Sequence, residues 1–501
     1  MYKSFALISL IIIAGYTLVD CAREEDDGEE LAKKYCSSCH LFVQPALLDK
    51  TTWKSTVLPA MGRLLKIGQD PFEESDRIIS HDTSSLSAKE WRKIVAYYVS
   101  NAPDKMPNQS RSPVDKKTLR FTIEKKELGT IPTNTYLKID PLNKWIYASG
   151  MDSSLAIFDS QLSLVNRNSL DGILVDMFFK DKPGAREGFL TQIGIMNPND
   201  LKTGSAVAFT INDKGKLESR KVFDTLPRPV QTISADLDVD GRPDYLVCGF
   251  GNKEGSFFWM RDAGNNKFEQ KMLRPLPGAI KAYIDDVNKD GLPDIIALFA
   301  QGQEGIYLFL NRGGGEFETK EMLRFPPVYG STFFEMLDFN GDGKKDIIYT
   351  CGDNADYSKV LKNYHGIYIY LDQGNFSFKQ QYFFPLHGAF KALAKDFDRD
   401  GDLDIAAISY FPDDNQQPME GFILLEQTEE FKFTPYSIKE YNEGHWITMD
   451  AGDIDADGDD DIVIGSLFLP IEISKTKLDL KTRPLFLLLR NNLIKKQVAT
   501  N

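Results

Sequence analysis

The sequence predicts a mixed multidomain protein in which a small all-α domain precedes an all-β propeller of seven blades. A C-x-x-C-H motif at residues 36–40 is flanked by helix-forming segments. An aspartate-rich motif recurs after residue 235 at intervals of about fifty residues, which is a repeat length of propeller blades. Each copy is followed by a short apolar run typical of a strand. The chain of 501 residues is also too long for a single compact core.

The N-terminus predicts an export signal. Lys3 precedes an apolar run over residues 5–19, which is shorter than the roughly 20 residues of a membrane-spanning helix. We therefore expect a signal peptide over residues 1–20. The sequence Leu-Val-Asp-Cys at residues 18–21 resembles a lipobox and implies lipidation of Cys21, although an aspartate is unusual just before the cleavage point. The alternative is an uncleaved membrane anchor. In both cases the body is expected in the cell envelope, as an outer-membrane lipoprotein that is periplasmic or surface-exposed.

Cys36, Cys39 and His40 form the C-x-x-C-H pattern of covalent c-type haem attachment. Two thiols at this spacing can each add to a vinyl group, and the histidine that follows can ligate the iron. A thioredoxin-like redox pair would not require His40, and a zinc site would require two further Cys or His residues nearby. We therefore expect covalent haem c as a cofactor.

The sequence around the motif predicts a haem domain over residues 28–104. Residues 87–99 have the periodicity of an amphipathic helix, with Ser87 as its cap and with Trp91, Ile94 and Tyr98 on one stripe. This segment resembles the last helix of the cytochrome c fold. Residues 105–120 are rich in Pro, Ser and charge and predict a linker, after which the propeller occupies residues 121–495.

The cytochrome c resemblance implies an axial methionine between the haem motif and the last helix. Met61 lies in that interval and is the predicted sixth ligand. Met106, after the last helix, and His81, in a polar loop, are the alternatives. Coordination by His and Met would favour electron transfer over oxygen chemistry.

The aspartate-rich motif reads D-x-[DN]-x-D-G-x-x-D. An EF-hand loop begins in the same way, but it needs a glutamate at position 12 and flanking helices, whereas these motifs have apolar residues there and join strands. Oxygen side chains at positions 1, 3, 5 and 9 predict Ca²⁺ binding, and about five such ions would neutralise most of the net charge of −14. The predicted ligands are Asp236, Asp238, Asp240, Asp244, Asp286, Asn288, Asp290, Asp294, Asp338, Asn340, Asp342, Asp346, Asp396, Asp398, Asp400, Asp404, Asp453, Asp455, Asp457 and Asp461.

The same order of four strands surrounds each motif, and two upstream segments, residues 135–149 and 173–192, have the strand pattern without the motif. Together they predict seven blades. Residues 170–468 resemble the FG-GAP/VCBS-repeat family of integrin-type propellers, and the whole chain resembles cytochrome-fused lipoproteins of that family. The resemblance implies Ca²⁺ in the loop between strands one and two. It implies a fold far more than an activity.

Two cysteines remain unassigned by these motifs. Cys248 and Cys351 lie in apolar strand-like runs of non-neighbouring repeats. They are expected to be buried free thiols, and a disulfide between them is the alternative.

A ligand-binding face is predicted on the side of the propeller opposite the Asp-rich loops. The connection after the third Asp-rich motif is longer than its equivalents and rich in polar side chains, and long loops on a rigid scaffold often carry function. The alternative for each residue is an ordinary solvated loop position. The candidates are Arg228, Lys281, Gln301, Glu304, Asp353, Asn354, Asp356, Tyr364, His365, Lys391 and His445.

The expected function is one-electron transfer by an exported c-type cytochrome whose propeller binds a redox partner protein or a small substrate. A cytochrome-coupled oxidoreductase and a surface adhesin or glycan binder are the alternatives.

The negative charge and the absence of a long basic run argue against nucleic acid, and membrane association is expected through the lipid anchor only. No G-x-S-x-G or H-E-x-x-H motif supports hydrolysis. Five histidines are too few for a multi-copper or di-haem site. A quinoprotein would repeat a tryptophan motif in every blade. An electron carrier is therefore favoured over a complete catalyst.

Overall fold

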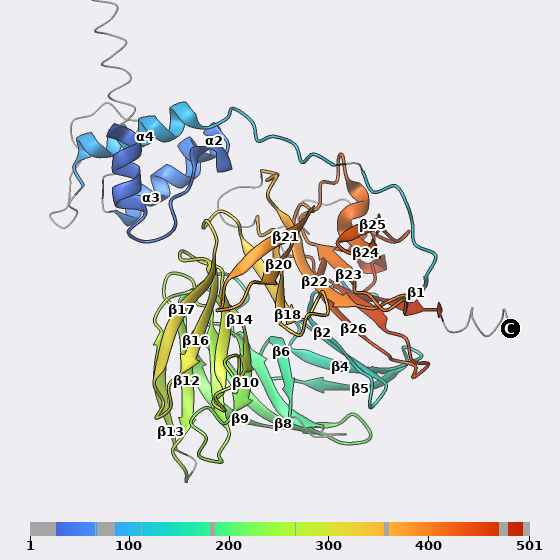
Figure 1. Ribbon diagram of the computed structural model, residues 1–501. Coiled ribbons are helices and arrows are strands. Elements are labelled where there is room, and N and C mark those ends of the chain that lie inside the picture. The colour runs from blue at the N-terminus through green and yellow to red at the C-terminus, as the bar shows by residue number, and fades with distance from the viewer. Residues whose placement is uncertain are drawn as a thin grey trace, which may run out of the picture. The chain divides into compact units, whose positions relative to one another are not determined.

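The computed structural model describes residues 27–65, 67, 86–111, 113–180, 186–265, 267–354, 360–469 and 479–493 (Figure 1). The chain divides into two compact units. The first comprises residues 1–109 with the short segments 326–328 and 354–363, and the second comprises residues 110–325, 329–353 and 364–501. The predicted signal peptide and Cys21 lie outside the described residues. Among the helices that the structure describes, none has the length and apolarity needed to cross a membrane.

The first unit consists of a few short helices. A helix over residues 27–36 carries the first cysteine of the C-x-x-C-H motif. It is followed by the 3-10 turn η1 (Pro45–Leu47), α2 (Lys50–Thr52), the π-helical segment η2 (Trp53–Val57), α3 (Leu58–Leu64) and α4 (Ala88–Asn101). The segments α2, η2 and α3 are continuous. Pro59 is the second residue after the π-helical segment, and it cannot donate the backbone hydrogen bond that a regular α-helix needs there.

The predicted amphipathic helix is confirmed as α4. Ser87 and Glu90 form a capping box, in which each side chain bonds the other residue's backbone N–H. Trp91, Ile94 and Tyr98 are all buried and pack in the core of the first unit. The periodicity of apolar residues therefore identified the face of this helix correctly.

The second unit is a propeller of seven four-stranded antiparallel sheets, as predicted. Blade 1 contains β2 (Asn134–Asp140), β3 (Trp145–Gly150), β4 (Ser154–Asp159) and β5 (Leu164–Ser169). Blade 2 contains β6 (Leu174–Phe179), β7 (Glu187–Gln192), β8 (Gly204–Ile211) and β9 (Leu217–Leu226). Blade 3 contains β10 (Pro229–Ala235), β11 (Asp244–Gly249), β12 (Ser256–Asp262) and β13 (Phe268–Arg274). Blade 4 contains β14 (Ala279–Asp285), β15 (Asp294–Phe299), β16 (Gly305–Asn311) and β17 (Phe317–Arg324).

The remaining blades continue the same pattern. Blade 5 contains β18 (Ser331–Leu337), β19 (Asp346–Cys351), β20 (Gly366–Asp372) and β21 (Phe378–Pro385). Blade 6 contains β22 (Ala389–Lys395), β23 (Asp404–Ser409), the short 3-10 turn η3 (Pro418–Gly421), β24 (Phe422–Glu429) and β25 (Lys432–Tyr436). Blade 7 contains β26 (Trp446–Gly452), β27 (Asp461–Ser466), the 3-10 turn η4 (Leu480–Thr482) and β28 (Phe486–Asn491), and β1 (Phe121–Lys126) supplies its fourth strand.

The ring closes through the two ends of the propeller sequence. β1 pairs antiparallel with β28, from Phe121 opposite Asn491 to Lys126 opposite Phe486. Blade 7 therefore combines strands from both ends of the propeller. Because this pairing closes the ring, the two ends of the propeller sequence do not leave unpaired strand edges at a gap between blades.

The middle strands of the blades are almost entirely buried, and their apolar side chains fill the space between neighbouring sheets. Cys248 and Cys351 lie in these strands. Both are buried, and no described cysteine forms a disulfide with either, as predicted.

The segment before β1 packs against the propeller in addition to leading into it. Val114 is buried in the core that β23 and β24 share with blade 5. Lys117 forms a β-bridge with Ser437, beyond the end of β25. Composition predicts a linker over residues 105–120, whereas residues 110–120 belong to the second unit. The reason is that a single buried apolar side chain and a few backbone hydrogen bonds can fix a segment whose composition is otherwise that of a linker.

Candidate functional site

The C-x-x-C-H motif begins at the end of a helix. Cys36 is the last residue of the helix over residues 27–36, and the Cys39 N–H donates to the Cys36 carbonyl at 3.4 Å across the turn that follows. Cys36 is half-buried, Cys39 is exposed, and both are free. This arrangement offers two thiols one turn apart for attachment to a single group.

The environment of Cys36 is unlike that of a redox-active dithiol. Burial raises the pKa of the Cys36 thiol to about 11, and the hydrogen bond with Tyr98 only partly opposes this effect. Reactive cysteines of disulfide oxidoreductases have lowered pKa values instead. The surroundings of Cys36 therefore disfavour thiol–disulfide exchange.

His40 is half-buried, and its Nδ1 lies 2.7 Å from the Leu41 carbonyl oxygen. Because a carbonyl can only accept, Nδ1 carries the proton in this bond and Nε2 is left as the basic nitrogen. Metal-ligating histidines are commonly held in this way, with one ring N–H donated to a carbonyl and the other nitrogen on the metal. The geometry of His40 therefore suits an axial ligand.

Met61 lies on α3 and is half-buried against the core of the first unit. Its neighbour Gly62 contacts the ring of Trp91, because a Cβ at that glycine would lie 3.3 Å from Trp91 Cζ2. The Trp91 Nε1 is buried and has no hydrogen-bond partner among the described residues. A buried donor without an acceptor is costly. This orphaned N–H is consistent with an additional polar group in the core. Met106 is half-buried, and His81 lies outside the described residues.

All five Asp-rich loops share one backbone hydrogen-bond pattern. The N–H of the glycine at position 6 donates to the aspartate at position 1, at 2.8–3.2 Å in every loop. This glycine has a positive φ in every loop, as the tight turn requires. The predicted placement between strands one and two is confirmed for all five motifs.

The aspartate at position 9 begins the second strand of its blade and is fully buried in each case. One carboxylate oxygen accepts the N–H of position 2 at 3.0–3.2 Å. The other oxygen accepts an N–H from the third strand at 2.7–2.9 Å. Burial raises the pKa of all five, to about 7 for those of blades 6 and 7. The five residues are Asp244, Asp294, Asp346, Asp404 and Asp461.

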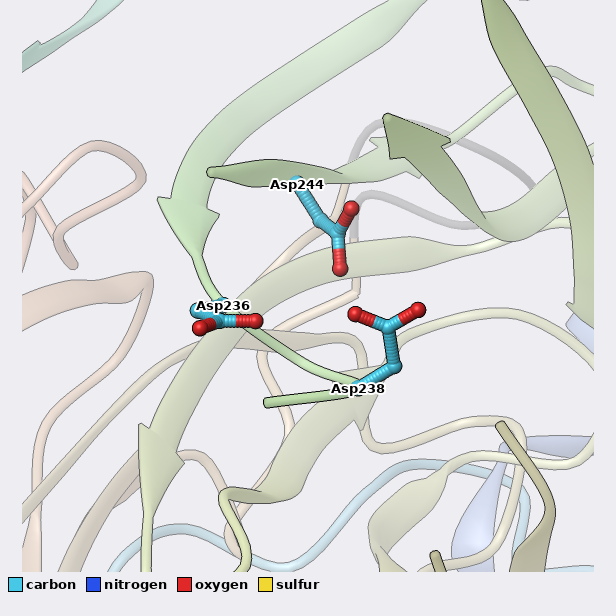
Figure 2. A group of neighbouring side chains, drawn as sticks. All are labelled: Asp236, Asp238 and Asp244. Carbon is cyan, nitrogen blue, oxygen red and sulfur yellow. The ribbon is translucent and has the colours of Figure 1, made fainter. Parts of the chain in front are cut away.

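The loops provide oxygen atoms that fit a hard cation. Figure 2 shows the carboxylates of Asp236, Asp238 and Asp244 facing one another across a small space, and one oxygen of each lies within 4.8 Å of the others. The Asp238 Oδ1 is buried without a hydrogen-bond partner among the described residues, and so is the Asp396 Oδ1 in blade 6. Buried, unpaired carboxylate oxygens are the donors that Ca²⁺ prefers. The donor set of these loops therefore fits Ca²⁺.

The residue at position 4 of each loop was not recognised in the sequence. It adopts the left-handed conformation in every loop, although it is a glycine only in blade 5. Val239 in blade 3 has φ 58° and Ala456 in blade 7 has φ 62°. The repeated conformation would have been visible only if all five loops carried glycine or asparagine there. Arginines that pair with loop aspartates at position 3 were also missed because they lie more than twenty residues away in sequence; they are Arg120, Arg261 and Arg490.

Several residues of the predicted ligand face are committed to internal contacts. Arg228 is buried and donates to the carbonyls of Gly251 and Met196, at 2.6 and 3.0 Å, so it joins two loops. Glu304 is buried and accepts from the backbone N–H and the hydroxyl of Ser331, at 3.1 and 2.7 Å. Burial raises the pKa of Glu304 to about 8 despite these hydrogen bonds.

The long connection of blade 5 runs over residues 352–365 between β19 and β20. Tyr364 stacks on Tyr329 with ring centroids 4.8 Å apart, and His365 is fully buried next to it. Asn354 is also buried, and the backbone N–H of Asp353 donates to the Gly330 carbonyl at 3.1 Å. Asp356 lies outside the described residues. The described residues of this connection are therefore more tightly packed than their polar composition suggests.

Two other predicted residues, Lys281 and Lys391, are brought together at the axis of the propeller. They lie on β14 and β22, and the first strands of neighbouring blades contact one another around the ring. Their ammonium nitrogens lie 3.9 and 5.1 Å from the centroid of the Phe333 ring on β18. Burial and the charge of Lys391 lower the pKa of Lys281 to about 7.

The axis also contains carboxylates. Asp176 and Glu335 face the two lysines from β6 and β18, and burial raises the pKa of Asp176 to about 6. The remaining predicted residues are Gln301, in the connection between β15 and β16, and His445, whose ring lies 4.9 Å from that of Phe468. The structure therefore divides the predicted face into an axial charged group and a set of packed loop residues.

Comparison with known proteins adds a family assignment for part of the propeller. A search of curated proteins found no significant relative of the chain. The model of the FG-GAP-like repeat family matches residues 236–297, 286–349 and 396–464. Each matched segment begins at the first aspartate of one Asp-rich loop and extends through the loop of the next blade. The seven-bladed propeller of this chain therefore contains FG-GAP-like repeats.

Proposed function

We propose that the chain is an exported c-type cytochrome that carries out one-electron transfer, with a calcium-stabilised propeller as its partner- or substrate-binding module. The observation that carries the proposal is the geometry of His40. Its Nδ1–H is held by the Leu41 carbonyl, directly after two free thiols one turn apart. A zinc site would need further Cys or His ligands, and the raised pKa of Cys36 disfavours a redox dithiol.

In this proposal Cys36 and Cys39 would hold the haem through thioether bonds, and His40 Nε2 would ligate its iron. Met61 is the proposed second ligand. The haem would supply an iron centre that cycles between two oxidation states, and His/Met ligation raises its potential. The buried Trp91 Nε1 would donate a hydrogen bond within the core. The apolar helices of the first unit would exclude water from the centre.

The haem proposal is tested by expressing the full chain with a c-type haem maturation system. We expect a pyridine haemochrome spectrum of a covalent haem that survives acid–acetone extraction. Replacing both cysteines by alanine should abolish covalent attachment, whereas Cys248→Ala in the propeller should leave it intact. Met61→Ala should remove the sulfur-to-iron absorption band of the oxidised protein. Persistence of that band would exclude Met61, and a haem-free wild type would contradict the proposal.

We also propose that about five Ca²⁺ ions occupy the Asp-rich loops and stabilise the propeller. Support comes from the buried, unpaired carboxylate oxygens and from the shared hydrogen-bond pattern of the loops. Each site filled at a free Ca²⁺ concentration a hundred times its Kd would add about 2.7 kcal/mol to the free energy of unfolding. Elemental analysis should find several equivalents of calcium. Chelation should lower the Tm, and added Ca²⁺ but not K⁺ should restore it.

The proposed location is the cell envelope, with lipidation at Cys21. This proposal rests on the sequence of residues 1–21 alone. Metabolic labelling with a fatty-acid analogue should mark the wild-type protein and leave Cys21→Ser unlabelled. Accessibility to an added protease in intact cells would distinguish a surface-exposed protein from a periplasmic one. An unlabelled, fully cytoplasmic wild type would contradict the proposal.

A second function, cytochrome-coupled oxidation of a small molecule, is favoured by the axial group of Lys281 and Lys391 against Phe333. Such a group could bind and orient a polar substrate at the centre of the ring. A screen of sugars and alcohols for haem reduction by the purified protein tests this function, with Lys281→Met as the matched variant. Haem reduction that Lys281→Met abolishes would support the oxidoreductase. Fast exchange with a small cytochrome and no reduction by any compound would leave electron transfer alone.

A further inference from the structure

A buried arginine that has no counter-ion among the described residues lies at the edge of blades 3 and 4. Arg274 is the last residue of β13 and is only 8% exposed. Its guanidinium carbon lies 3.7 Å from the ring centroid of Tyr307 and 4.4 Å from that of Phe299. One terminal nitrogen, Nη2, donates to Gln303 Oε1 at 2.6 Å. The other, Nη1, is buried and has no hydrogen-bond partner among the described residues.

This arrangement is costly unless an anion completes it. Arginine is rarely buried without a partner, because removing an ion from water is costly even after relaxation. The aromatic rings offset only part of that cost through cation–π attraction. Within the described part of the chain, no carboxylate lies within 4.0 Å of the Arg274 guanidinium. The positive charge therefore lacks the counter-ion that a buried arginine normally has.

A second arginine lies on the same aromatic ring. The Arg324 guanidinium carbon, at the end of β17, is 5.8 Å from the Tyr307 centroid. The close approach depends on Gly305, where a Cβ would lie 3.2 Å from Arg324 Cδ and 3.3 Å from Tyr307 Cε2. Arg324 Nε is also buried without a hydrogen-bond partner in the described structure, while Nη1 pairs with the half-exposed Glu321. Two cations thus share one ring, and in the part of the chain that the structure describes Glu321, on Arg324, is the one carboxylate that pairs with either of them.

We propose that Arg274 and Arg324 form a binding site for an oxyanion group, a carboxylate or a sulfate, of a small ligand such as an acidic saccharide. Arg274 Nη1–H and Arg324 Nε–H are the two donors, and the buried Tyr307 ring supports the Arg274 guanidinium that covers it. Guanidinium groups suit such anions because their planar N–H groups match the spacing of paired oxygens. The site lies at the ends of β13 and β17, at the edge of the propeller opposite the Asp-rich loops. It requires neither haem nor the axial lysines, so it is independent of the proposed electron transfer.

The proposal is tested by calorimetric titration of the full chain, saturated with Ca²⁺, with sodium glucuronate, sodium sulfate and glucose. Binding of glucuronate or sulfate, with no binding of glucose, is expected. Glucuronate alone would identify a carboxylate ligand, and sulfate alone would identify a sulfate ester. Absence of binding by both anions, or equal binding of glucose, would overturn the proposal.

Variants distinguish this site from nonspecific charge. Arg274→Gln should weaken binding about tenfold or more, because a charge-assisted hydrogen bond is lost. Arg312→Gln, which removes a cation in the turn after β16 that pairs with Glu318, should leave binding unchanged. Glu321→Gln should strengthen binding about two- to fivefold by releasing Arg324 from its own carboxylate.

Glu321→Gln also protects the test against a folding defect, since this side chain is 55% exposed and its loss does not disturb the core. Wild-type affinity in a folded Arg274→Gln, or weaker binding by Glu321→Gln, would overturn the assignment.

Discussion

Glu304 makes the stability of the propeller depend on pH in a direction opposite to that of most carboxylates. Its side chain is 2% exposed, and burial raises its pKa from 4.5 to about 8. The folded state therefore binds a proton that the unfolded chain releases between these two values. The stabilisation is complete below about pH 4.5 and is lost as the pH rises through about 8.

The magnitude follows from the shift. One pKa unit corresponds to about 1.36 kcal/mol, so the Glu304 contribution falls by about 4 kcal/mol between pH 5 and pH 8 as an upper bound. Glu304→Gln is neutral at every pH and can still accept the Ser331 N–H and hydroxyl through Oε1. We therefore expect the variant to match the wild type near pH 5 and to exceed it by up to about 4 kcal/mol at pH 8.5.

The assay is urea unfolding of both proteins at pH 5, 7 and 8.5 in saturating Ca²⁺, followed by tryptophan fluorescence. Glu316→Gln is the matched control, because Glu316 is an exposed carboxylate of the neighbouring hairpin and should change the free energy of unfolding little at any pH. A difference between Glu304→Gln and the wild type that stays constant from pH 5 to pH 8.5 would refute the reasoning.

Three other substitutions test the loops and the first unit. Asp461→Asn should lower the free energy of unfolding by about 1–3 kcal/mol even without Ca²⁺, because an amide can accept only one of the two N–H groups from Ile454 and Asn491; the exposed Asp213→Asn is the control in the same urea titration. Val239→Gly should raise stability by up to about 1 kcal/mol, since a β-branched residue is strained at φ 58°, and a loss of stability in thermal unfolding would contradict this. Gly28→Ala should destabilise the first unit by about 1–3 kcal/mol, because its Cβ would lie 2.8 Å from the Lys93 carbonyl oxygen and 2.9 Å from Tyr97 Cβ. An unchanged melting temperature of the far-ultraviolet helix signal would contradict this prediction.

The number of blades and the position of the Asp-rich loops could be predicted from the sequence because both depend on short local patterns. The motif places an aspartate at the start of the second strand and a glycine at the turn, and repetition makes the pattern visible. Helix α4 could be predicted for the same reason, since its cap and its apolar stripe lie within one segment. These features need no knowledge of which distant residues meet.

The destinations of polar side chains could not be predicted in this way. Arg228 and Glu304 were candidates for ligand binding because they lie near connections, yet each bonds to groups more than twenty residues away. Arg274 was not noticed at all, since nothing in its local sequence shows that Tyr307 and Phe299 enclose it. Burial of a polar residue depends on the tertiary packing. In this packing Arg228, which was a predicted ligand-binding residue, supports two loops, whereas Arg274 becomes a candidate binding residue.

Within each Asp-rich motif, the hydrogen bonds of the loop differ from one position to another. The aspartate at position 9 has both oxygens bonded to backbone N–H groups, and position 1 is held by the glycine N–H, so both are fixed by the fold itself. Asp238 at position 3 has one oxygen on Arg261 and the other buried and unpaired. In blade 3 an ion would therefore gain most from position 3, whereas in blade 6 the buried oxygen without a partner among the described residues belongs to Asp396, at position 1. The loop conformation is therefore fixed by hydrogen bonds of positions 1, 6 and 9, while the residue at position 3, which is asparagine in blades 4 and 5, would change the negative charge offered to a cation. Loops with the same backbone can in this way differ in their strength as metal sites.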